Sequence, residues 1–482
     1  MYYFNQCIYQ FVLALIIVFC ATVLNAAEFY VDPVNGSMSN DGSQAHPWST
    51  MQEVWSTGKI HTKKWVRPLT DPLKMVDVNP SGPVKPGDTI YLMSGYHGFL
   101  SVNGAVNDDW IYIKAYPGET PKFRRIYLRT VSKWSFDGIS ISLSYSGDAY
   151  AAGSTTMFSV EHYDTEGPGS HITIKNSEIF SAVLDPAWTA QNWLDIVASG
   201  ISVLKAPYSI VDNVDMSVIN FGVMFTRSDF CELRNSNISE IRGDGVRNTQ
   251  GDYVKVEDNT IKNSYFINDN HNDMIQVSVD KTVVPSPPVI GMEIRRNILI
   301  GNEDEHQPFI SGVQGIGMFD GFYEDCMIEN NLLVVHTNHG ISLYGARNCI
   351  VRNNTVTMHW TVAETLKAPI NIVAHKDGTP GSGNIIINNF ATTVYAGTNN
   401  SGGVVTNSNN ITGFTPADHF TNPTNFDYSL KSTSAAINAG STLSAPTTDI
   451  LKRSRDHAPD IGAYEFLKLP APQGFNFLPI QN

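Results

Sequence analysis

The sequence predicts an all-β protein folded as a right-handed parallel β-helix, because two short strand patterns alternate along it. The first holds one inward apolar residue and reads GDGVRN at 243–248, HNDMIQ at 271–276, QGIGMF at 314–319, HGISLY at 339–344 and, more loosely, INIVAHKDG at 370–378. The second is apolar-x-apolar-x-Asn, as in VKVEDNTI from Val254 and CIVRNNTV from Cys349. Two period-two strands per repeat are what a coiled parallel sheet requires. A doubly wound sheet would need long amphipathic helices between strands, and the sequence shows none.

The spacing of the second pattern gives the length of one coil. Asn213 and Asn235 are 22 residues apart, and Asn330 and Asn353 are 23 apart, so longer intervals contain inserted loops. Stacked Asn side chains at this turn are predicted to hydrogen-bond along the axis. The predicted column of turn residues is Asn176, Asn213, Asn235, Asp258, Arg296, Asn330, Asn353 and Asn389.

The two ends of the chain are predicted to flank one long solenoid domain. Residues 1–26 are predicted to be a signal peptide, because Phe11–Leu24 is mostly apolar and Ala26 and Ala27 suit cleavage; an N-terminal membrane anchor is the alternative. Residues 27–467 form the β-helix domain, with an N-terminal cap over 29–52 and a looser closing segment over 427–466, and 468–482 form a tail. The mature protein is therefore expected to be secreted or periplasmic, with no membrane attachment.

The net charge indicates which molecules the protein can bind, and the cysteines indicate whether it contains disulfides. The net charge of −14 and pI of about 5.3 argue against nucleic acid, and a monomer is expected. Cys231, Cys326 and Cys349 each open a second strand and should face inward. Cys326 and Cys349 lie in consecutive coils, so a disulfide is geometrically possible at a strand spacing of about 4.8 Å. We favour the interpretation that these cysteines are buried thiols that act as small hydrophobic side chains.

Aligning the first-strand copies on their inward residues places polar side chains in columns on one outer face. The residues taken as inward are Val246, Ile275, Ile316, Ile341 and Ile372. The position before them is mostly glycine: Gly222, Gly245, Met274, Gly315 and Gly340. The position after them is polar or small: Ser202, Met224, Arg247, Gln276, Gly317, Ser342 and Asn371. A glycine strip beside these side chains predicts a shallow groove that a flat chain can enter.

Further candidates surround this groove. Asp244, Asp273, Gln314 and His339 share one rim column, and Phe319 and Tyr344 lie in an outward column on the other side. His271, Asp320, His375 and Lys376 sit at nearby strand ends, and Phe319, Phe322, Tyr323 and Tyr344 are candidates to stack on sugar rings. Lys205 and Arg227 share a strand-end column that would extend a basic subsite, although solvated strand ends explain them equally well. A single His at a strand end is more often a hydrogen-bonded corner residue than a catalytic residue.

A resemblance to a known group of proteins fits these residues. The stretches NDNHNDMIQ (268–276), QGIGMFDGFYEDCMIENN (314–331), NHGISLYGARNCIVRNNTV (338–356) and AHKDGTPGSGN (374–384) resemble secreted bacterial β-helix proteins related to polysaccharide lyases, particularly alginate lyases. Such lyases cleave a 4-linked uronan by β-elimination. The resemblance implies a groove on the first sheet, a Lys, Tyr or His base, and Arg or amide groups on the substrate carboxylate. It also implies calcium in some members, but the Glu-rich calcium motif followed by Lys is missing here, so no cofactor is expected.

The chemistry of β-elimination selects among the candidates. The proton on C5 becomes acidic only when the neighbouring carboxylate is neutralised, so hydrogen-bond donors must meet the developing charge. Our hypothesis takes His339 or His271 as base, Tyr344 as proton donor to the leaving oxygen, and Arg247 with Gln276 as the carboxylate clamp. Gln314, Asp320, His375 and Lys376 complete the substrate contacts.

Two other functions remain open from the sequence. Asp244 and Asp273 lie one coil apart, so their strands are separated by about 4.8 Å, close to the carboxyl spacing of retaining glycoside hydrolases. A non-catalytic glycan-binding solenoid is the third possibility. Nor does the sequence choose among alginate, glucuronan, pectin and glycosaminoglycan.

Overall fold

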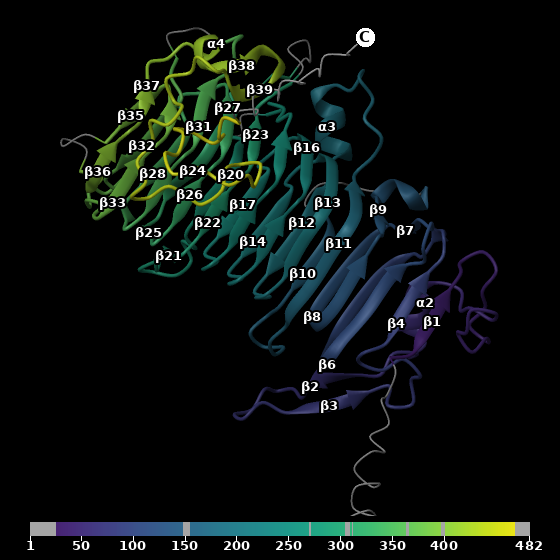
Figure 1. Ribbon diagram of the computed structural model, residues 1–482. Coiled ribbons are helices and arrows are strands. Elements are labelled where there is room, and N and C mark those ends of the chain that lie inside the picture. Colours follow the sequence, from purple (N-terminus) through teal and green to yellow (C-terminus); the bar gives the residue numbers. More distant parts are fainter. Residues whose placement is uncertain are drawn as a thin grey trace, which may run out of the picture.

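The computed structural model describes residues 26–147, 155–268, 271–303, 309–310, 312–362, 366–396 and 401–467. It confirms the predicted right-handed parallel β-helix: strands coil around one axis, and each strand pairs in parallel with its counterpart in the next coil (Figure 1). The signal-peptide prediction falls almost entirely outside the described residues, and so does the tail after Leu467. In the described part of the chain, no helix is long and apolar enough to cross a membrane.

Each regular coil contributes one strand to each of three sheets. The first sheet, which carries the polar face, contains β6 (Phe99–Ala115), β8 (Arg125–Asp137), β10 (Thr156–Glu161), β12 (Ser199–Leu204), β14 (Val223–Thr226), β17 (Val246–Thr249), β20 (Asp273–Ser278), β24 (Gln314–Asp320), β28 (Ile341–Tyr344), β32 (Pro369–Val373) and β35 (Thr393–Tyr395). The long strands β6 and β8 continue into the second sheet.

The second sheet follows the first along the chain. It contains β1 (Glu28–Val31), β4 (Thr89–Leu92), β11 (Ser170–Phe180), β13 (Ile210–Ile219), β15 (Glu232–Arg234), β18 (Lys255–Glu257), β22 (Glu293–Arg295), β26 (Met327–Glu329), β30 (Ile350–Arg352), β33 (Asn384–Ile387) and β36 (Val404–Ser408). Short strands β21 (Val289–Ile290), β25 (Tyr323–Glu324) and β29 (Ala346–Arg347) form a small sheet before it in three coils.

The third sheet completes the coil and includes the far ends of β11 and β13. Its own strands are β5 (Gly95–Tyr96), β7 (Pro121–Phe123), β9 (Ser140–Ile141), β16 (Asn237–Ile241), β19 (Thr260–Lys262), β23 (Ile298–Ile300), β27 (Leu332–Val335), β31 (Thr355–Met358), β34 (Phe390–Ala391) and β37 (Ile411–Thr412). The hairpin of β2 (Thr62–Trp65) and β3 (Met75–Val78) joins β6 through one antiparallel pairing, Lys63 with Val106, and β38 (Phe420–Asn422) pairs with β39 (Asp427–Leu430) outside the three sheets. The helices are α2 (Met51–Ser56), α3 (Ala190–Ile196), α4 (Pro416–His419), η1 (Leu143–Ser146) and η2 (Pro423–Asn425).

The strand register confirms the predicted columns of the first sheet. Val246 pairs with Ile275, Ile275 with Ile316, and Ile316 with Ile341, and all four side chains are buried in the core. The last inward residue is corrected: Ile341 pairs with Ile370, and Ile372 pairs with Leu343. The polar column is continuous, because Met224 pairs with Arg247, Gln276 with Gly317, and Ser342 with Asn371. Polar side chains from distant parts of the chain therefore share one face.

The turn between the second and third sheets holds a ladder of asparagines. The turn residues adopt the left-handed conformation (φ 50–61°) in each predicted coil, except that the last member is Asn388 and not Asn389. The residue after the turn points inward. From Asn259 through Asn297, Asn331 and Asn354 to Asn389, each side chain amide donates to the carbonyl oxygen of the next at 2.9–3.0 Å. The predicted axial hydrogen bonding is present, one residue later than expected.

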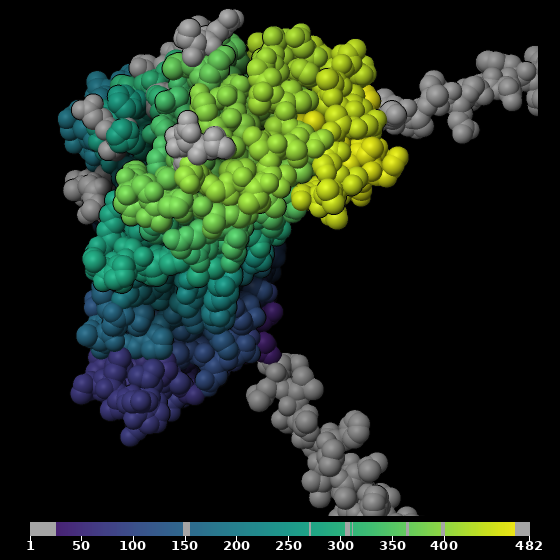
Figure 2. Space-filling model, turned by 90° about the vertical axis from the view of Figure 1, so that its left-hand side faces the viewer, coloured from purple at the N-terminus to yellow at the C-terminus, as the bar shows by residue number. Residues whose placement is uncertain are grey.

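The two ends of the solenoid are covered differently. Helix α2 closes the N-terminal end with Met51 and Val54 in the core, as expected. The C-terminal segment instead packs along the third sheet, where Phe420, Tyr428 and Ile461 join the outward side chains of β23, β27 and β34 in a second apolar cluster. Figure 2 shows this yellow segment against the flank of the molecule, with the purple N-terminal coils at the opposite end. All three described cysteines are buried unpaired thiols, as favoured from the sequence.

Candidate functional site

The centre of the polar face is built from pairs of side chains three residues apart on successive strands. Asp244 lies beside Arg247, Asp273 beside Gln276 and His339 beside Ser342, and Asp273 is paired in register with Gln314. In each pair the first residue precedes the strand's inward apolar residue by two positions and the second follows it by one. The coil repeat therefore stacks one chemical pair above the next along β17, β20, β24 and β28.

Both carboxylate oxygens of Asp244 accept hydrogen bonds from within the protein. Its Oδ2 accepts hydrogen bonds from Arg247 Nε and a terminal guanidinium nitrogen at 2.9 and 2.6 Å, and its Oδ1 accepts from the Asp273 amide at 2.9 Å. Burial raises the pKa of Asp244, and Arg247 opposes that shift. The Arg247 guanidinium also lies 4.4 Å from the Phe221 ring centroid. Arg247 is thus already paired, which corrects its expected role as a clamp on the substrate carboxylate.

Asp273 is the chemically unusual carboxyl of the site. It is 2% exposed, its Oδ2 accepts from Gln276 Nε2 at 3.0 Å, and its Oδ1 has no hydrogen-bond partner among the described residues. Burial, and next the nearby Asp244, raise the pKa of Asp273 to about 8, so the carboxyl is protonated at neutral pH. Gly317 faces it: a Cβ there would lie 2.5 Å from Oδ1. The missing side chain of Gly317 therefore leaves the space that this carboxyl occupies.

A bulge in β24 brings three aromatic rings to the same place. The register shifts after Val277, which pairs with Met318, so that Ser278 pairs with Asp320 and Phe319 is the extra residue. The Phe319 ring contacts the His339 and Tyr344 rings edge to face, with both centroid distances 5.2 Å. Phe319 therefore lies between the imidazole and the phenol that the sequence assigned to catalysis.

His339 has the properties of a base. Its Nδ1 lies 3.3 Å from Ser342 Oγ, and among the described residues Nε2 has no hydrogen-bond partner. Burial lowers the pKa of the imidazole below its usual range, and the neighbouring His271 lowers it further. The ring is thus neutral near pH 7. His271 is exposed and lies beside the buried Asn272, which is anchored to the Ser264 side chain and the Tyr265 carbonyl.

The other edge of the site is a cationic pocket of about 380 Å³. Lys376 Nζ donates to Asp320 at 2.6 Å, and Lys281 lies 3.4 Å from the same carboxylate. Burial would raise the pKa of Asp320, but these two ammonium groups hold it below its usual range. The His375 ring lies 4.5 Å from that of Phe322, which also lines the pocket. The structure thus places Asp320, His375 and Lys376 together, as the sequence suggested.

The predicted glycine floor is wrong at most positions. A Cβ at Gly222, Gly245, Gly315 or Gly340 would meet core side chains of the third sheet or the next coil's backbone, not the outer face. These glycines lie at the corner that leads into the strand, where the period-two alternation has not yet begun. At Gly317, from the polar column, Asp273 Oδ1 and the Phe319 ring fill the space on the outer face that a Cβ would take.

Three predicted substrate contacts are also corrected. Tyr323 is fully buried, and its hydroxyl donates to the Val277 carbonyl and accepts from the Asp320 amide, so it cannot stack on a sugar. Lys205 donates to both oxygens of Asp164 at 2.6–2.7 Å, and Arg227 pairs with Asp280. The basic subsite expected at these two residues is therefore neutralised.

Sequence reasoning missed Lys281 and the importance of Phe322. Lys281 lies in a loop inserted between β20 and β21, outside the repeat pattern, so no column of the alignment contained it. Phe322 lies in the turn after β24, and the structure shows that it is the candidate stacking ring that lines the cationic pocket. Among the described residues, no three His, Cys, Asp or Glu side chains gather closely enough to hold a metal ion.

Comparison with known proteins agrees with the fold. No protein-family model matches the sequence, and no curated protein matches it. Among solved structures, XylC in complex with xylose has a TM-score of 0.55 at 10% identity, and the match covers 92% of this chain and 99% of that one. Pectate lyase Pel9A (TM-score 0.49, 15% identity) and a rhamnogalacturonan lyase (0.47, 13%) each cover 92% of this chain and 97% of their own. At these identities, the comparison shows only that the chain has the parallel β-helix fold.

Proposed function

We propose that the protein is a polysaccharide lyase that cleaves a 4-linked uronan by β-elimination on the first sheet, with alginate the favoured substrate. One observation carries the proposal: a carboxyl that is protonated at neutral pH, Asp273, lies in the same cluster as a neutral imidazole, His339. β-Elimination needs a neutral base and hydrogen-bond donors that face a carboxylate. Both are present here, and neither the base nor the donors carry a charge.

The residues take the following roles. His339 Nε2 accepts the C5 proton, the electron pair of the broken C5–H bond forms the C4–C5 double bond, and the bond from C4 to the glycosidic oxygen breaks. Tyr344 donates a proton to that oxygen. The Gln276 amide, anchored on the buried and protonated Asp273, donates its second N–H to the uronate carboxylate, where charge grows in the transition state. Gln314, which is half-buried on the same face, contacts a sugar hydroxyl through its side-chain amide.

Arg247 acts indirectly in this scheme. Its two hydrogen bonds to Oδ2 make Asp244 the better compensated carboxyl of the pair. Arg247, Asp244 and the buried Asp273 are therefore positioning residues, and Gln276 is the group that touches the substrate. This assignment replaces the clamp expected from the sequence.

A glycoside hydrolase is the second candidate, and the same carboxyl favours it. The pKa of Asp273 is raised and that of Asp320 is lowered, which is the divergence expected of an acid and its ionised partner. Asp244, the partner suggested by the sequence, is bound by Arg247 and a backbone amide. A hydrolase would thus use Asp273 as its acid with a different second carboxylate.

The product separates the two candidates. A lyase acting on a panel of uronans forms an unsaturated, ultraviolet-absorbing sugar with each new reducing end, whereas a hydrolase forms reducing ends alone. We expect unsaturated product from the natural protein and a loss of about 10²–10⁴-fold in His339→Gln. Reducing ends without the absorbance would replace the lyase with the hydrolase.

The setting of the reaction is part of the proposal. Export from the cytoplasm, action as a monomer on an acidic polysaccharide, and neutralisation of the carboxylate by protein donors without calcium are all proposed on the sequence features given above.

A further inference from the structure

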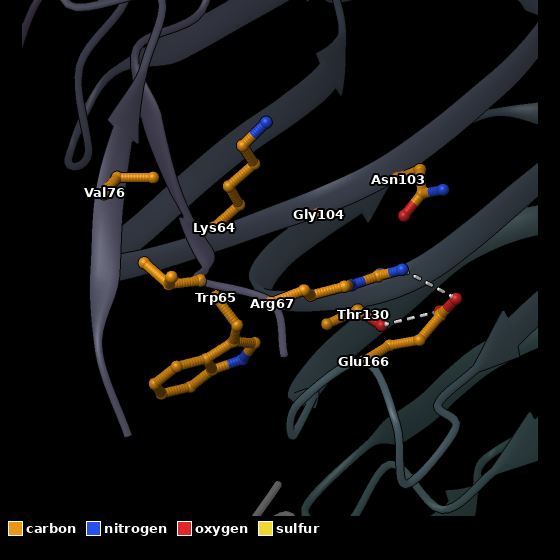
Figure 3. Close-up of a pocket in the computed structure, with 9 residues that line it drawn as sticks. Lys64, Trp65, Arg67, Val76, Asn103, Gly104, Thr130 and Glu166 are labelled. Atoms are coloured by element: carbon orange, nitrogen blue, oxygen red, sulfur yellow. Dashed lines mark hydrogen bonds and ion pairs between the residues drawn. The ribbon is translucent and has the colours of Figure 1, made fainter. Parts of the chain in front are cut away.

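A cavity of about 560 Å³ lies at the N-terminal end of the molecule, far from the site just described. The β2–β3 hairpin forms one wall through Lys64, Trp65 and Arg67, and the first-sheet strands β6 and β8 form the floor through Asn103 and Thr130 (Figure 3). The hairpin is an insertion between α2 and β4 and has no counterpart in the repeats. Nothing in the proposed reaction uses this cavity.

The cavity is positively charged in a protein whose net charge is −14. Its one lining carboxylate, Glu166, is bound by two arginines: Arg129 donates to both of its oxygens, and Arg67 donates at 3.1 Å. Lys64 has no acidic partner among the described residues, and in Figure 3 its ammonium points away from the Arg67–Glu166 pair. Two arginines against one glutamate, plus a lysine, leave an excess of positive charge for an anion.

Trp65 supplies a fixed apolar surface beside these charges. Its indole nitrogen donates to the Pro168 carbonyl at 2.9 Å, and a Cβ at Gly167 (φ +93°) would lie 2.2 Å from the ring. The ring is thus held against a glycine and still lines the cavity. The Lys64 stem crosses Gly104 in a similar way, because a Cβ there would lie 3.3 Å from Lys64 Cβ. An aromatic plane beside a cation suits a sugar ring that bears a carboxylate.

The cavity floor is continuous with the face that carries the catalytic cluster. Asn103 pairs with Arg129, and the same outward column then runs strand by strand to Asp320: Glu161, Leu204, Thr226, Thr249 and Ser278. Six strand spacings separate Arg129 from Asp320, or about 29 Å. Most residues between them are small or hydroxyl-bearing, and the Glu161 carboxylate accepts from the hydroxyls of Tyr127 and Tyr163. One extended sugar chain can therefore cover both places.

We infer that the Lys64–Trp65–Arg67 cavity is a remote subsite that binds a carboxylate-bearing sugar unit of the same polymer that is cleaved at His339. The inference rests on the proposed function for the polymer's identity. We assign a carboxylate-bearing sugar to this cavity because the cavity has excess positive charge, an aromatic wall, and a floor on the same face as the catalytic cluster. A 4-linked pyranose is about as long as one strand spacing, so a chain must have roughly six or seven units to occupy both sites.

Chain length gives the decisive test. In Lys64→Gln, we expect KM for a uronate polymer to rise several-fold with kcat unchanged, because the lost contact is equal in ground and transition states. A trimer or tetramer of the same uronate should be cleaved as by the natural protein. Lys63→Gln is the matched control, since Lys63 is the adjacent residue on β2 and pairs with Asp108 on the other side of the strand. An equal change with short and long substrates, or none with either, overturns the inference.

Direct binding separates this inference from the proposed reaction. In calorimetric titration, an oligouronate of about eight units should bind the natural protein more tightly than Lys64→Gln, and a neutral oligosaccharide of equal length should show no difference. If the protein binds in this way without forming unsaturated product, the proposed function fails and the subsite stands. If unsaturated product forms but Lys64→Gln binds as tightly as the natural protein, the subsite fails and the proposed function stands. Binding of inorganic sulfate alone at Lys64 would also overturn the subsite.

Discussion

At the scale of single residues, Asp273 shows how a solenoid alters the chemistry of an ordinary carboxyl. The coil repeat places Asp244 one strand away, and burial removes water from both side chains. Arg247 compensates Asp244 but reaches Asp273 only at a distance, so the two carboxyls differ. A protonated acid at neutral pH follows from packing alone.

This difference predicts a bell-shaped dependence of activity on pH. Activity should rise as His339 loses its proton, at a pH below the usual range for His, and should fall as Asp273 ionises near pH 8. In Asp273→Asn the alkaline fall should disappear, because Asn keeps donors that do not titrate, and activity should stay within about tenfold. The measurement is kcat/KM against pH for both proteins. If Asp273→Asn loses about 10³-fold at every pH instead, Asp273 is a proton donor and the hydrolase is favoured.

At the scale of strands and turns, the asparagine ladder holds the coils in register. Asn331 accepts from the Asn297 amide and side chain and donates to the carbonyl oxygens of Ile294 and Asn354. Each of these groups is buried, so its hydrogen-bonding capacity is met only within the ladder.

Replacing one member should therefore be costly. Asn331→Ala leaves two donors and one acceptor unpaired in the core, and each costs about 1–3 kcal/mol, so we expect a loss of about 3–9 kcal/mol. Urea denaturation measures the loss, and hydrogen exchange should locate it in the flanking coils. Asn237→Ala is the control, because the Asn237 side chain is exposed and bonds to Asp215 at the surface. Equal stability of the two variants would show that the ladder does not stabilise the solenoid.

The sequence was most informative at this middle scale. The repeat gave the columns of Arg247, Gln276 and Ser342 correctly, because inward apolar residues fix the register. It failed where the repeat is interrupted: glycines at corners point inward, the bulge at Phe319 moves a ring, and Lys281 comes from an inserted loop. It could not show that Arg247 is paired or that Asp273 is protonated, since both depend on burial and on neighbours one coil away.

At the scale of the whole molecule, the C-terminal segment determines which flank of the solenoid meets water. Arg455 is buried and donates to Glu465, Asn330 and the Gly462 carbonyl, which ties the segment to the third sheet. Beneath it lie Leu332, Val334 and Phe390, which would otherwise be exposed on the outer side of their strands.

Removing this contact should release the segment. Arg455→Met leaves Glu465 buried without its partner and should cost about 3–5 kcal/mol. Limited proteolysis should then cut within residues 420–467 much faster than in the natural protein. Lys452→Met, which removes an exposed pair with Asp258, should change the cleavage rate little. Equal cleavage of the two variants would contradict the role of Arg455.

The proposed cleavage of a uronan depends on the whole molecule. The coils assemble His339, Tyr344 and Asp273 on one face, and the N-terminal cavity extends that face along the axis. The most direct measurement is the ratio of unsaturated product to new reducing ends when the purified protein acts on a panel of uronans, with His339→Gln beside it. We expect one unsaturated sugar for each new reducing end, and almost none of either in the variant. Reducing ends without unsaturation, or no cleavage of any uronan, would contradict it.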